Sequence, residues 1–192
     1  MALQIISPPA IEPISLQEAK DHLRLDFNDD DSLIESLLIP AARQFAEDYT
    51  HRALITQTLE YSLDDFTKTI KLPKPPLKYV ISINYQDLTQ TIVTLDPTQY
   101  QAYPEDTPAI ICQSYGTIWP VALPVKNAIK IRYIAGYGNP QDIPATLRAA
   151  MLLIIGHLYE NREENTIASG TIQTLPMGVK SLLNPHRLVS FS

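Results

Sequence analysis

The hydrophobic residues of this chain repeat with the period of a helix near both ends and with the period of a strand in the middle. Around residues 33–49 and again around 145–160, apolar side chains recur every three or four positions, as on one face of an α-helix. Residues 79–85 and 128–134 instead alternate in the manner of a half-buried strand. These patterns predict an α+β fold: a helical bundle of three main helices and a short C-terminal helix, interrupted by an antiparallel β insertion.

Proline content and the change of period place the predicted boundaries. The first 14 residues hold Pro8, Pro9 and Pro13 and show no periodicity, which predicts an extended N-terminal arm. Within the middle part, we expect two short runs, 56–63 and 69–72, to form a hairpin. The predicted organisation is therefore an N-terminal arm at 1–14, a helical bundle at 15–55 and 136–162, a β module at 56–135, and a C-terminal segment at 163–192.

Two serine–glutamate pairs indicate where the first helices begin. Ser15 with Glu18 and Ser32 with Glu35 both match the capping box, in which the two side chains satisfy free amides at the start of a helix. Pro40 lies inside the second helical pattern, where it removes one backbone donor and crowds the preceding turn. We therefore expect the second helix to kink or to shift its backbone hydrogen bonds near Pro40.

The third helical pattern, which runs to about residue 161, is apolar around more than one side. Leu152 and Leu153 widen a stripe formed by Leu147, Ala150, Met151, Ile154, Ile155 and Leu158. A helix of this kind is buried on more than one side. We expect the sheet to cover one of its faces, and other helices or a second subunit to cover another.

Charge and composition narrow the classes of function. The 192 residues carry a net charge of −6, and residues 1–60 hold 11 acidic against four basic side chains. A protein that reads a nucleic-acid sequence usually shows a basic patch instead. The four lysines of the middle region predict a charge-protected edge strand, with contact to a nucleic-acid backbone as the alternative. They are Lys68, Lys71, Lys74 and Lys78.

Targeting and redox signals are also informative. No apolar run approaches the roughly 20 residues that a membrane helix needs, and the first residues lack the basic start of a signal peptide. The single cysteine, Cys112, excludes an internal disulfide, and its apolar neighbours predict a buried structural thiol. We expect a protein suited to a reducing cytoplasm, without a membrane partner.

Residues that could carry chemistry do not combine into a site. The stretch Gly136-Tyr137-Gly138 lacks the third glycine of a dinucleotide-binding loop. His157 and Glu160 are three residues apart on one predicted helix and could share a metal, but zinc needs three or four ligands. We therefore expect no catalytic residue, no metal and no cofactor. A small metal-dependent hydrolase that uses these two residues is the enzymatic alternative.

Several short segments occur in an order that is similar to one family. They are ISLQEAKDHLRLD at 14–26, DDSLIESL at 30–37, LDPTQY at 95–100, YIAGYG at 133–138, HLYENRE at 157–163, and LPMGV followed by LLNPHR within 175–187. No single segment is specific, but their order covers about residues 14–187. In this combination the chain resembles the phage head–tail connector (adaptor) proteins of the gp6-like, or phiE125 gp8-like, family.

The resemblance implies a structural subunit of a virion and not an enzyme. Such proteins form a homo-oligomeric ring under the portal protein, at the head–tail interface, after synthesis in the cytoplasm of the bacterial host. The ring extends the channel through which DNA passes without sequence-specific binding, and it docks a stopper or tail-completion protein. The C-terminal segment would bind the portal. By position, this role falls on Leu175, Pro176, Val179, Leu182, Leu183, Pro185, Arg187 and Phe191.

The acidic run Asp29, Asp30 and Asp31 adds a hypothesis about the channel. Carboxylates on the wall of a DNA channel would repel the phosphates, so we expect these three residues to face the channel. Helix capping explains the same acids without any DNA, because carboxylates stabilise the start of a helix. Another neck protein, a stopper or a tail terminator, is a further alternative, although three helices do not suit a chain dominated by a β-barrel.

Overall fold

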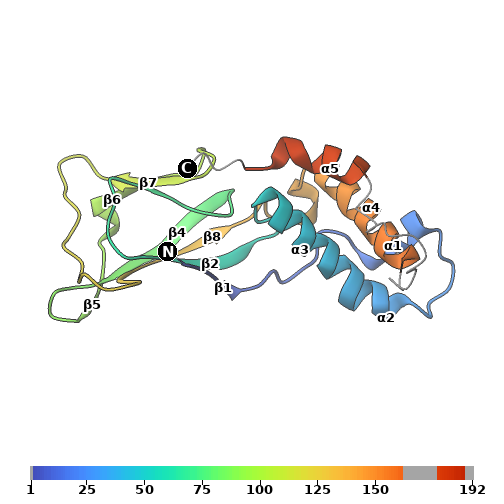
Figure 1. The fold of residues 1–192 in the computed structure, drawn as a ribbon, viewed down its shortest axis with the longest axis horizontal. Helices are drawn as coiled ribbons and strands as arrows, with labels where there is room; N and C mark the ends of the chain where they lie inside the picture. The colour runs from blue at the N-terminus through green and yellow to red at the C-terminus, as the bar shows by residue number, and fades with distance from the viewer. Residues whose placement is uncertain (1, 162–176, 189–192) are drawn as a thin grey trace, which may run out of the picture. The chain divides into compact units, whose positions relative to one another are not determined.

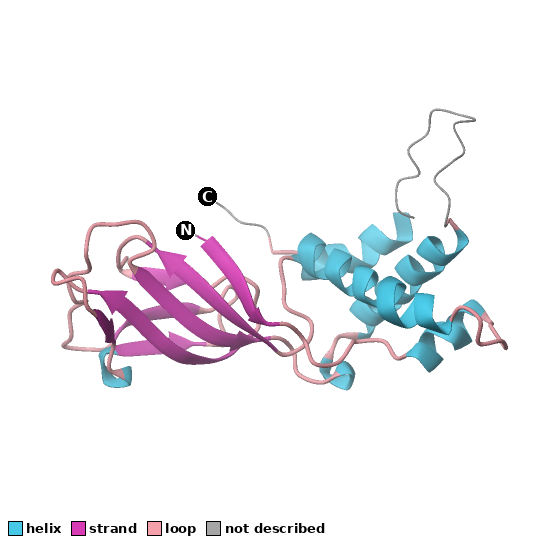
Figure 2. Cartoon of the chain, turned by 90° about the horizontal axis from the view of Figure 1, so that it is seen from below, coloured by secondary structure: helices cyan, strands magenta, loops and turns pink. Residues whose placement is uncertain are grey.

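The computed structural model, which describes residues 2–161 and 177–188, separates strands from helices (Figure 1). Residues 1–10 and 51–137 make a unit of strands, and residues 11–50 and 138–192 make a helical unit. Figure 2 shows the same division by colour, with the strands in magenta and the helices in cyan. Helices and antiparallel sheets are both present, so the predicted α+β class is confirmed.

The strand unit contains two antiparallel sheets. The larger has the order β1-β2-β8-β4-β5, and the smaller has the order β3-β7-β6. The larger sheet consists of Ala2–Ser7 (β1), Gln57–Leu63 (β2), Ile129–Ala135 (β8), Leu77–Gln86 (β4) and Ile92–Thr94 (β5). The smaller consists of Thr69–Lys71 (β3), Ile110–Gln113 (β7) and Tyr100–Tyr103 (β6), and the 3-10 turn Pro97–Gln99 (η2) precedes β6.

The two sheets share one hydrophobic core, which follows from strict alternation along β8. Ile129, Ile131, Tyr133 and Ala135 of β8 are buried, while the residues between them are polar or only partly covered. Other buried members come from both sheets, and they include Leu59, Leu63, Ile70, Ile83 and Ile111. At about 25 cal/mol per Å² of apolar surface, this shared burial is the main source of stability of the unit.

The helical unit is arranged around one long helix. Its elements are Leu16–Leu23 (α1), Asp31–Leu33 (α2), Ile34–Leu38 (η1), Ile39–Thr50 (α3), Pro140–Asp142 (η3), Ala145–Glu160 (α4), Met177–Leu183 (α5) and Asn184–His186 (η4). Helix α4 contacts α1, α3 and α5, and its side chains at Leu147, Ala150, Met151, Ile154 and Ile155 are buried. The expected burial on more than one side is present, but helices supply it, whereas the sheet that was expected to cover one face belongs to the other unit.

Pro40 is accommodated by a wide turn. Residues Ile34–Leu38 (η1) form a π-helix, in which the amide of Ile39 donates to the carbonyl of Ile34, five residues earlier. In a regular α-helix Pro40 could not donate to Ser36, and its ring would press on that carbonyl. The π-turn adds one residue to the turn before the proline and so avoids this conflict. The predicted shift of backbone hydrogen bonds near Pro40 is confirmed.

The N-terminal stretch is extended, but it is not a separate arm over residues 1–14. Residues Ala2–Ser7 form β1, which pairs with β2 in a register that places Leu3 opposite Tyr61 and Ile5 opposite Leu59. The three prolines of this stretch begin only at Pro8, so they leave the amides of β1 free to pair.

Two further expectations are wrong. The hairpin of residues 56–63 with 69–72 does not form, because β2 pairs with β1 and β8, whereas β3 pairs with β7 in the other sheet. The second capping box is also absent, since α2 begins directly after Asp30 and Ser32 lies inside the helix. The Ser32 position matched the capping pattern only in sequence.

Replacing Gly136 by alanine should strongly destabilise the strand unit. Gly136 has φ +123°, and a Cβ there would lie 2.4 Å from the carbonyl oxygen of Ile55. Backbone must move to relieve this clash, so we expect the free energy of unfolding to fall by about 3 kcal/mol or more. Urea unfolding followed through the fluorescence of Trp119, which stacks on Phe66 in the same unit, measures the loss.

Gly116→Ala is the matched control, because Gly116 also has a positive φ, +79°, but no atom lies within 4 Å of the added Cβ. We expect this variant to lose only about 1 kcal/mol, from backbone strain alone. Equal losses in the two variants would show that the contact with Ile55 is unimportant.

Candidate interaction surfaces

The C-terminal helix α5 is part of the helical unit. It contacts α4 and α3, and the side chains of Val179 and Leu183 are fully buried there. Leu182 is half-buried. Val179 and Leu183 therefore hold α5 in place in this conformation, and their role in portal binding stays a prediction.

The residues after α5 are fixed against the end of α3. The hydroxyl of Tyr49 donates to Oδ1 of Asn184 at 2.7 Å, and the guanidinium of Arg187 lies 5.3 Å from the centre of the Tyr49 ring. The amide of Leu188 donates to the carbonyl of Thr50 at 3.0 Å. These contacts hold a cationic side chain over an aromatic ring, an arrangement that stabilises both groups.

Of the remaining predicted portal-binding residues, Pro185 and Arg187 are exposed. Leu175, Pro176 and Phe191 lie outside the described residues. Met177, which the sequence did not single out, has 87% of its surface exposed at the start of α5. An exposed methionine suits an adaptable apolar contact, because its side chain is unbranched and flexible.

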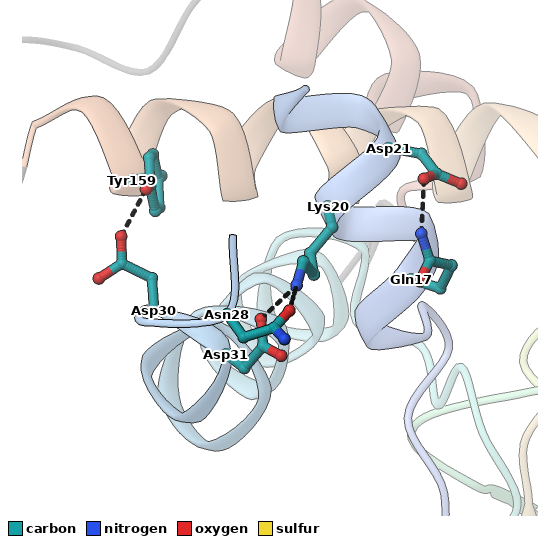
Figure 3. A network of polar contacts seen from close by, with 7 residues as sticks. All are labelled: Gln17, Lys20, Asp21, Asn28, Asp30, Asp31 and Tyr159. Atoms are coloured by element: carbon teal, nitrogen blue, oxygen red, sulfur yellow. Dashed lines mark hydrogen bonds and ion pairs between the residues drawn. The ribbon is translucent and has the colours of Figure 1, made fainter. Parts of the chain in front are cut away.

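The acidic turn between α1 and α2 is organised by Lys20 (Figure 3). Its ammonium donates to Oδ1 of Asn28 at 2.6 Å and pairs with Oδ1 of Asp31 at 2.7 Å. Only 9% of the Lys20 side chain is exposed, and a nearly buried ammonium needs such partners. Asp31 is thus committed to a contact inside the protein.

Asp30 is also used within the helical unit. Its Oδ2 accepts a hydrogen bond of 2.5 Å from the hydroxyl of Tyr159, near the end of α4, as Figure 3 shows. Asp29 is exposed, whereas Asp30 and Asp31 are half-buried. The structure therefore separates the three predicted channel residues: two anchor the turn, and Asp29 is turned to solvent.

A second polar contact joins α1 to α4. The capping box of Ser15 and Glu18 is present, with the Ser15 amide donating to Glu18 at 2.9 Å, and Glu18 also pairs with Arg148 of α4. The hydrogen bond from the Ser15 backbone, followed by the Ser15 hydroxyl and Arg148, lowers the pKa of Glu18 below its usual value despite partial burial. The first predicted capping box is confirmed. It caps the start of α1 and, through Glu18, also binds Arg148 of α4.

The outer face of the larger sheet combines a charge cluster with apolar side chains. Glu60 on β2 pairs with Arg132 at 2.8 Å and Lys130 at 3.5 Å, both on β8. Burial alone would raise the pKa of Glu60, but the two cations outweigh it and lower the pKa overall. Tyr79 and Ile81 of β4 are 57% and 47% exposed.

The residues considered for chemistry do not gather into a group of metal ligands in the described part of the chain. His157 and Glu160 lie on α4, where Nδ1 of His157 is 3.3 Å from the side-chain amide of Asn161. Cys112 is only half-buried, with its sulfur 3.9 Å from the hydroxyl of Thr69. Within residues 2–161 and 177–188, no group of three His, Cys, Asp or Glu side chains could hold a metal ion. Among those same residues, no helix has the length and apolar character needed to cross a membrane.

Comparison with protein families matches residues 13–111 and 122–187 to the phage gp6-like head-tail connector proteins. The matched residues come from both units and cover well over half of the chain. The chain belongs to this family. It is a structural subunit of the head–tail connector, as the resemblance implied, and the family is one of structural neck proteins. Comparison with curated proteins gives no significant match.

Solved structures with a similar fold come from gene transfer agent particles, abbreviated GTA. The neck of an empty GTA particle, computed with C6 symmetry, contains a chain with 24% sequence identity and a TM-score of 0.80. The virion of a native gene transfer agent contains a chain with 23% sequence identity and a TM-score of 0.81. The neck of the native particle, computed with C12 symmetry, contains one with 23% sequence identity and a TM-score of 0.78. In each case the match covers 100% of this connector protein and 98% of the other chain.

Sequence reasoning missed the role of Lys20 in this connector protein, although a signal was present. Lys20 lies four residues after Leu16 and three before Leu23, so it falls on the apolar side of α1. A lysine at such a position is nearly always paired. Tyr159 gave no comparable signal, because its partner Asp30 is 129 residues away.

Lys20→Met should loosen the acidic turn. The variant keeps the apolar stem but leaves Asn28 and Asp31 without their ammonium partner. We expect the helical unit to lose about 1–3 kcal/mol, since Asp31 remains partly hydrated. Urea unfolding followed by circular dichroism measures the loss, and hydrogen exchange should rise at residues 24–31. Lys180→Met, at an exposed position of α5, is the control and should change neither quantity; identical behaviour of both variants would refute the role of Lys20.

Proposed function

We propose that this connector protein forms a closed ring in the neck of a tailed phage or phage-like particle. The ring joins the portal to a stopper or tail-completion protein and extends the DNA channel. The observation that carries the proposal is the family match, which spans the strand unit and the helical unit alike. The similar chains in necks computed with C6 and C12 symmetry support a cyclic arrangement of copies. In this proposal the protein is made in the host cytoplasm and ends at the head–tail interface of the virion.

Portal binding is assigned to the exposed surface at the C-terminal end. The proposed contact residues are the exposed Met177, Pro185 and Arg187 and the half-buried Leu182. For Leu175, Pro176 and Phe191, only the resemblance to the family supports the proposal. Arg187 is held over Tyr49, and this support lowers the entropy cost of binding through its cation. A fixed cation two residues from the exposed Pro185 suits a protein partner with a carboxylate beside an apolar patch.

The charge of the helical unit fits a lumen that repels DNA. Residues 11–50 hold 10 acidic and three basic side chains, a net charge of −7, whereas the strand unit holds seven acidic and eight basic side chains. Like charge on a channel wall prevents phosphates from binding as DNA passes. Asp29 is the member of the acidic run that we assign to this surface, because Asp30 and Asp31 serve the turn.

Ring formation and portal binding can be measured together. Light scattering on the purified chain, alone and mixed with its portal, should give the mass of a ring in one of the two states. Arg187→Glu should weaken portal binding by about tenfold or more, through the loss of a cation and the repulsion of the opposing carboxylate. Lys180→Glu makes the same charge change on exposed α5 and should bind normally. A monomer that ignores the portal would contradict the proposed function.

The DNA channel is tested by a single charge reversal. Asp29→Lys should leave folding unchanged, because Asp29 is exposed, but it should slow DNA passage and lower particle infectivity by creating a phosphate-binding point. Asp106→Lys reverses an exposed charge in the strand unit and serves as the control. Equal infectivity of the two variants would contradict the assignment of Asp29 to the channel wall.

A further inference from the structure

The edges of the two sheets are protected unequally. At one edge of the smaller sheet, β3 carries Lys71 and follows Lys68, and both side chains are exposed. Lysines on an edge strand prevent other strands from adding to it. At one edge of the larger sheet, β1 has the uncharged sequence ALQIIS, and all six residues are exposed. The edge strand β3 is therefore protected by lysines against the addition of another strand, whereas β1 has no such charge.

The side chains of β1 indicate that a strand is missing beside it. Leu3 and Ile5 lie opposite Tyr61 and Leu59 of β2, which face the core. Leu3 and Ile5 thus point to the core side of the sheet, yet they remain 36% and 48% exposed because the sheet ends there. Figure 2 shows the N-terminal strand at this margin. One more strand would cover both side chains and pair the free backbone groups of β1.

The opposite edge of the same sheet, β5, is open as well. Its sequence Ile92–Thr94 is uncharged, and Ile92 is 74% exposed. The carboxylate of Asp87 accepts hydrogen bonds from the amides of Thr89 and Thr91, which fixes the turn that leads into β5. Val93 lies opposite Tyr85, whose ring packs on Phe66, so Val93 points to the core side of the sheet. The β5 edge is short, but it is ordered and presents a side chain to the same side as Ile5.

Strand direction decides how the two edges can meet. Neighbouring strands of this sheet are all antiparallel, so β1 and β5, the first and fifth in order, run in the same direction. Two β1 strands pairing with each other would create a closed two-fold dimer. Pairing of β1 with β5 of another copy is heterologous and repeats from copy to copy, which is what a cyclic ring requires.

We propose that β1 of one subunit pairs in parallel with β5 of the adjacent subunit, so that the five-stranded sheets join around the ring. The occupant of the β1 edge is thus a second copy of this chain. This inference rests on the proposed function, since it names the contact between neighbouring ring subunits. Backbone hydrogen bonds fix the register, and Leu3 and Ile5 pack beside Val93 on the core side.

Disulfide cross-linking tests this pairing on the full chain. In a Cys112→Ser background, Ile5→Cys and Val93→Cys together should give a ladder of covalent multimers on oxidation of the assembled ring, because neighbouring strands bring such residues within disulfide reach. Each single cysteine variant should give no ladder. Covalent dimers from Ile5→Cys alone would show that β1 pairs with itself and would overturn the proposal. An assembled ring that yields no cross-linked species from the double variant would overturn it too.

Light scattering before oxidation separates this inference from the proposed function. If the chain forms no ring, alone or with the portal, the proposed function fails and the inference fails with it. If the ring forms without cross-links, only the strand pairing fails. The two results are therefore distinguishable in one series of samples.

A charge on β1 gives an independent readout. Ile5→Lys should lower ring formation by about tenfold or more, because a lysine on an edge strand opposes strand addition. Ile81→Lys is the matched control, since Ile81 has nearly the same exposure, 47% against 48%, but lies on inner strand β4. Ring formation should be unchanged in this control. Loss of the ring in Ile81→Lys with a normal ring in Ile5→Lys would move the subunit contact to the sheet face and overturn the proposal.

Discussion

The helical unit depends on the apolar surface of α4, which contacts α1, α3 and α5. Apolar contact alone would let these helices slide, because it is not directional. Two polar contacts near the ends of α4 supply direction: Arg148 pairs with Glu18 of the α1 capping box, and Tyr159 donates to Asp30 before α2. Hydrophobic burial thus supplies the stability of the unit, while charged and polar pairs fix the register of its helices.

The two units differ in how the exposed backbone at helix ends and at sheet edges is treated. In the helical unit, the start of α1 is capped by Ser15 and Glu18, and the turn between α1 and α2 is held by Lys20. In the strand unit, β3 is closed by lysines, whereas β1 and β5 are left open. The two edges of the larger sheet are therefore uncharged, and another strand can add to them.

Most local signals in the sequence predicted the structure correctly, with the Ser32–Glu35 capping box as the exception, whereas long-range pairings were not predicted. The Ser15–Glu18 box and the disturbance at Pro40 depend on residues within one or two turns, so the sequence predicts both. The pairing of β2 with β8 joins residues about 70 positions apart, and nothing near β2 excludes the β3 hairpin that was expected instead. The sequence did not predict that Val179 and Leu183 are buried within the chain, because an apolar pattern on a short helix does not say whether its partner is the same chain or another. The family assignment came from the order of segments, which no local rule of folding contains.

The central elements of both units come late in the chain. Strand β8, the middle strand of the larger sheet, spans Ile129–Ala135, and α4 begins at Ala145. During synthesis on the ribosome, neither core can close until these residues have left the exit tunnel, although β1 and α1 emerge first. The nascent chain therefore exposes the uncharged strand β1 for most of its translation, and the early, acidic residues 11–50 keep that intermediate soluble by mutual repulsion.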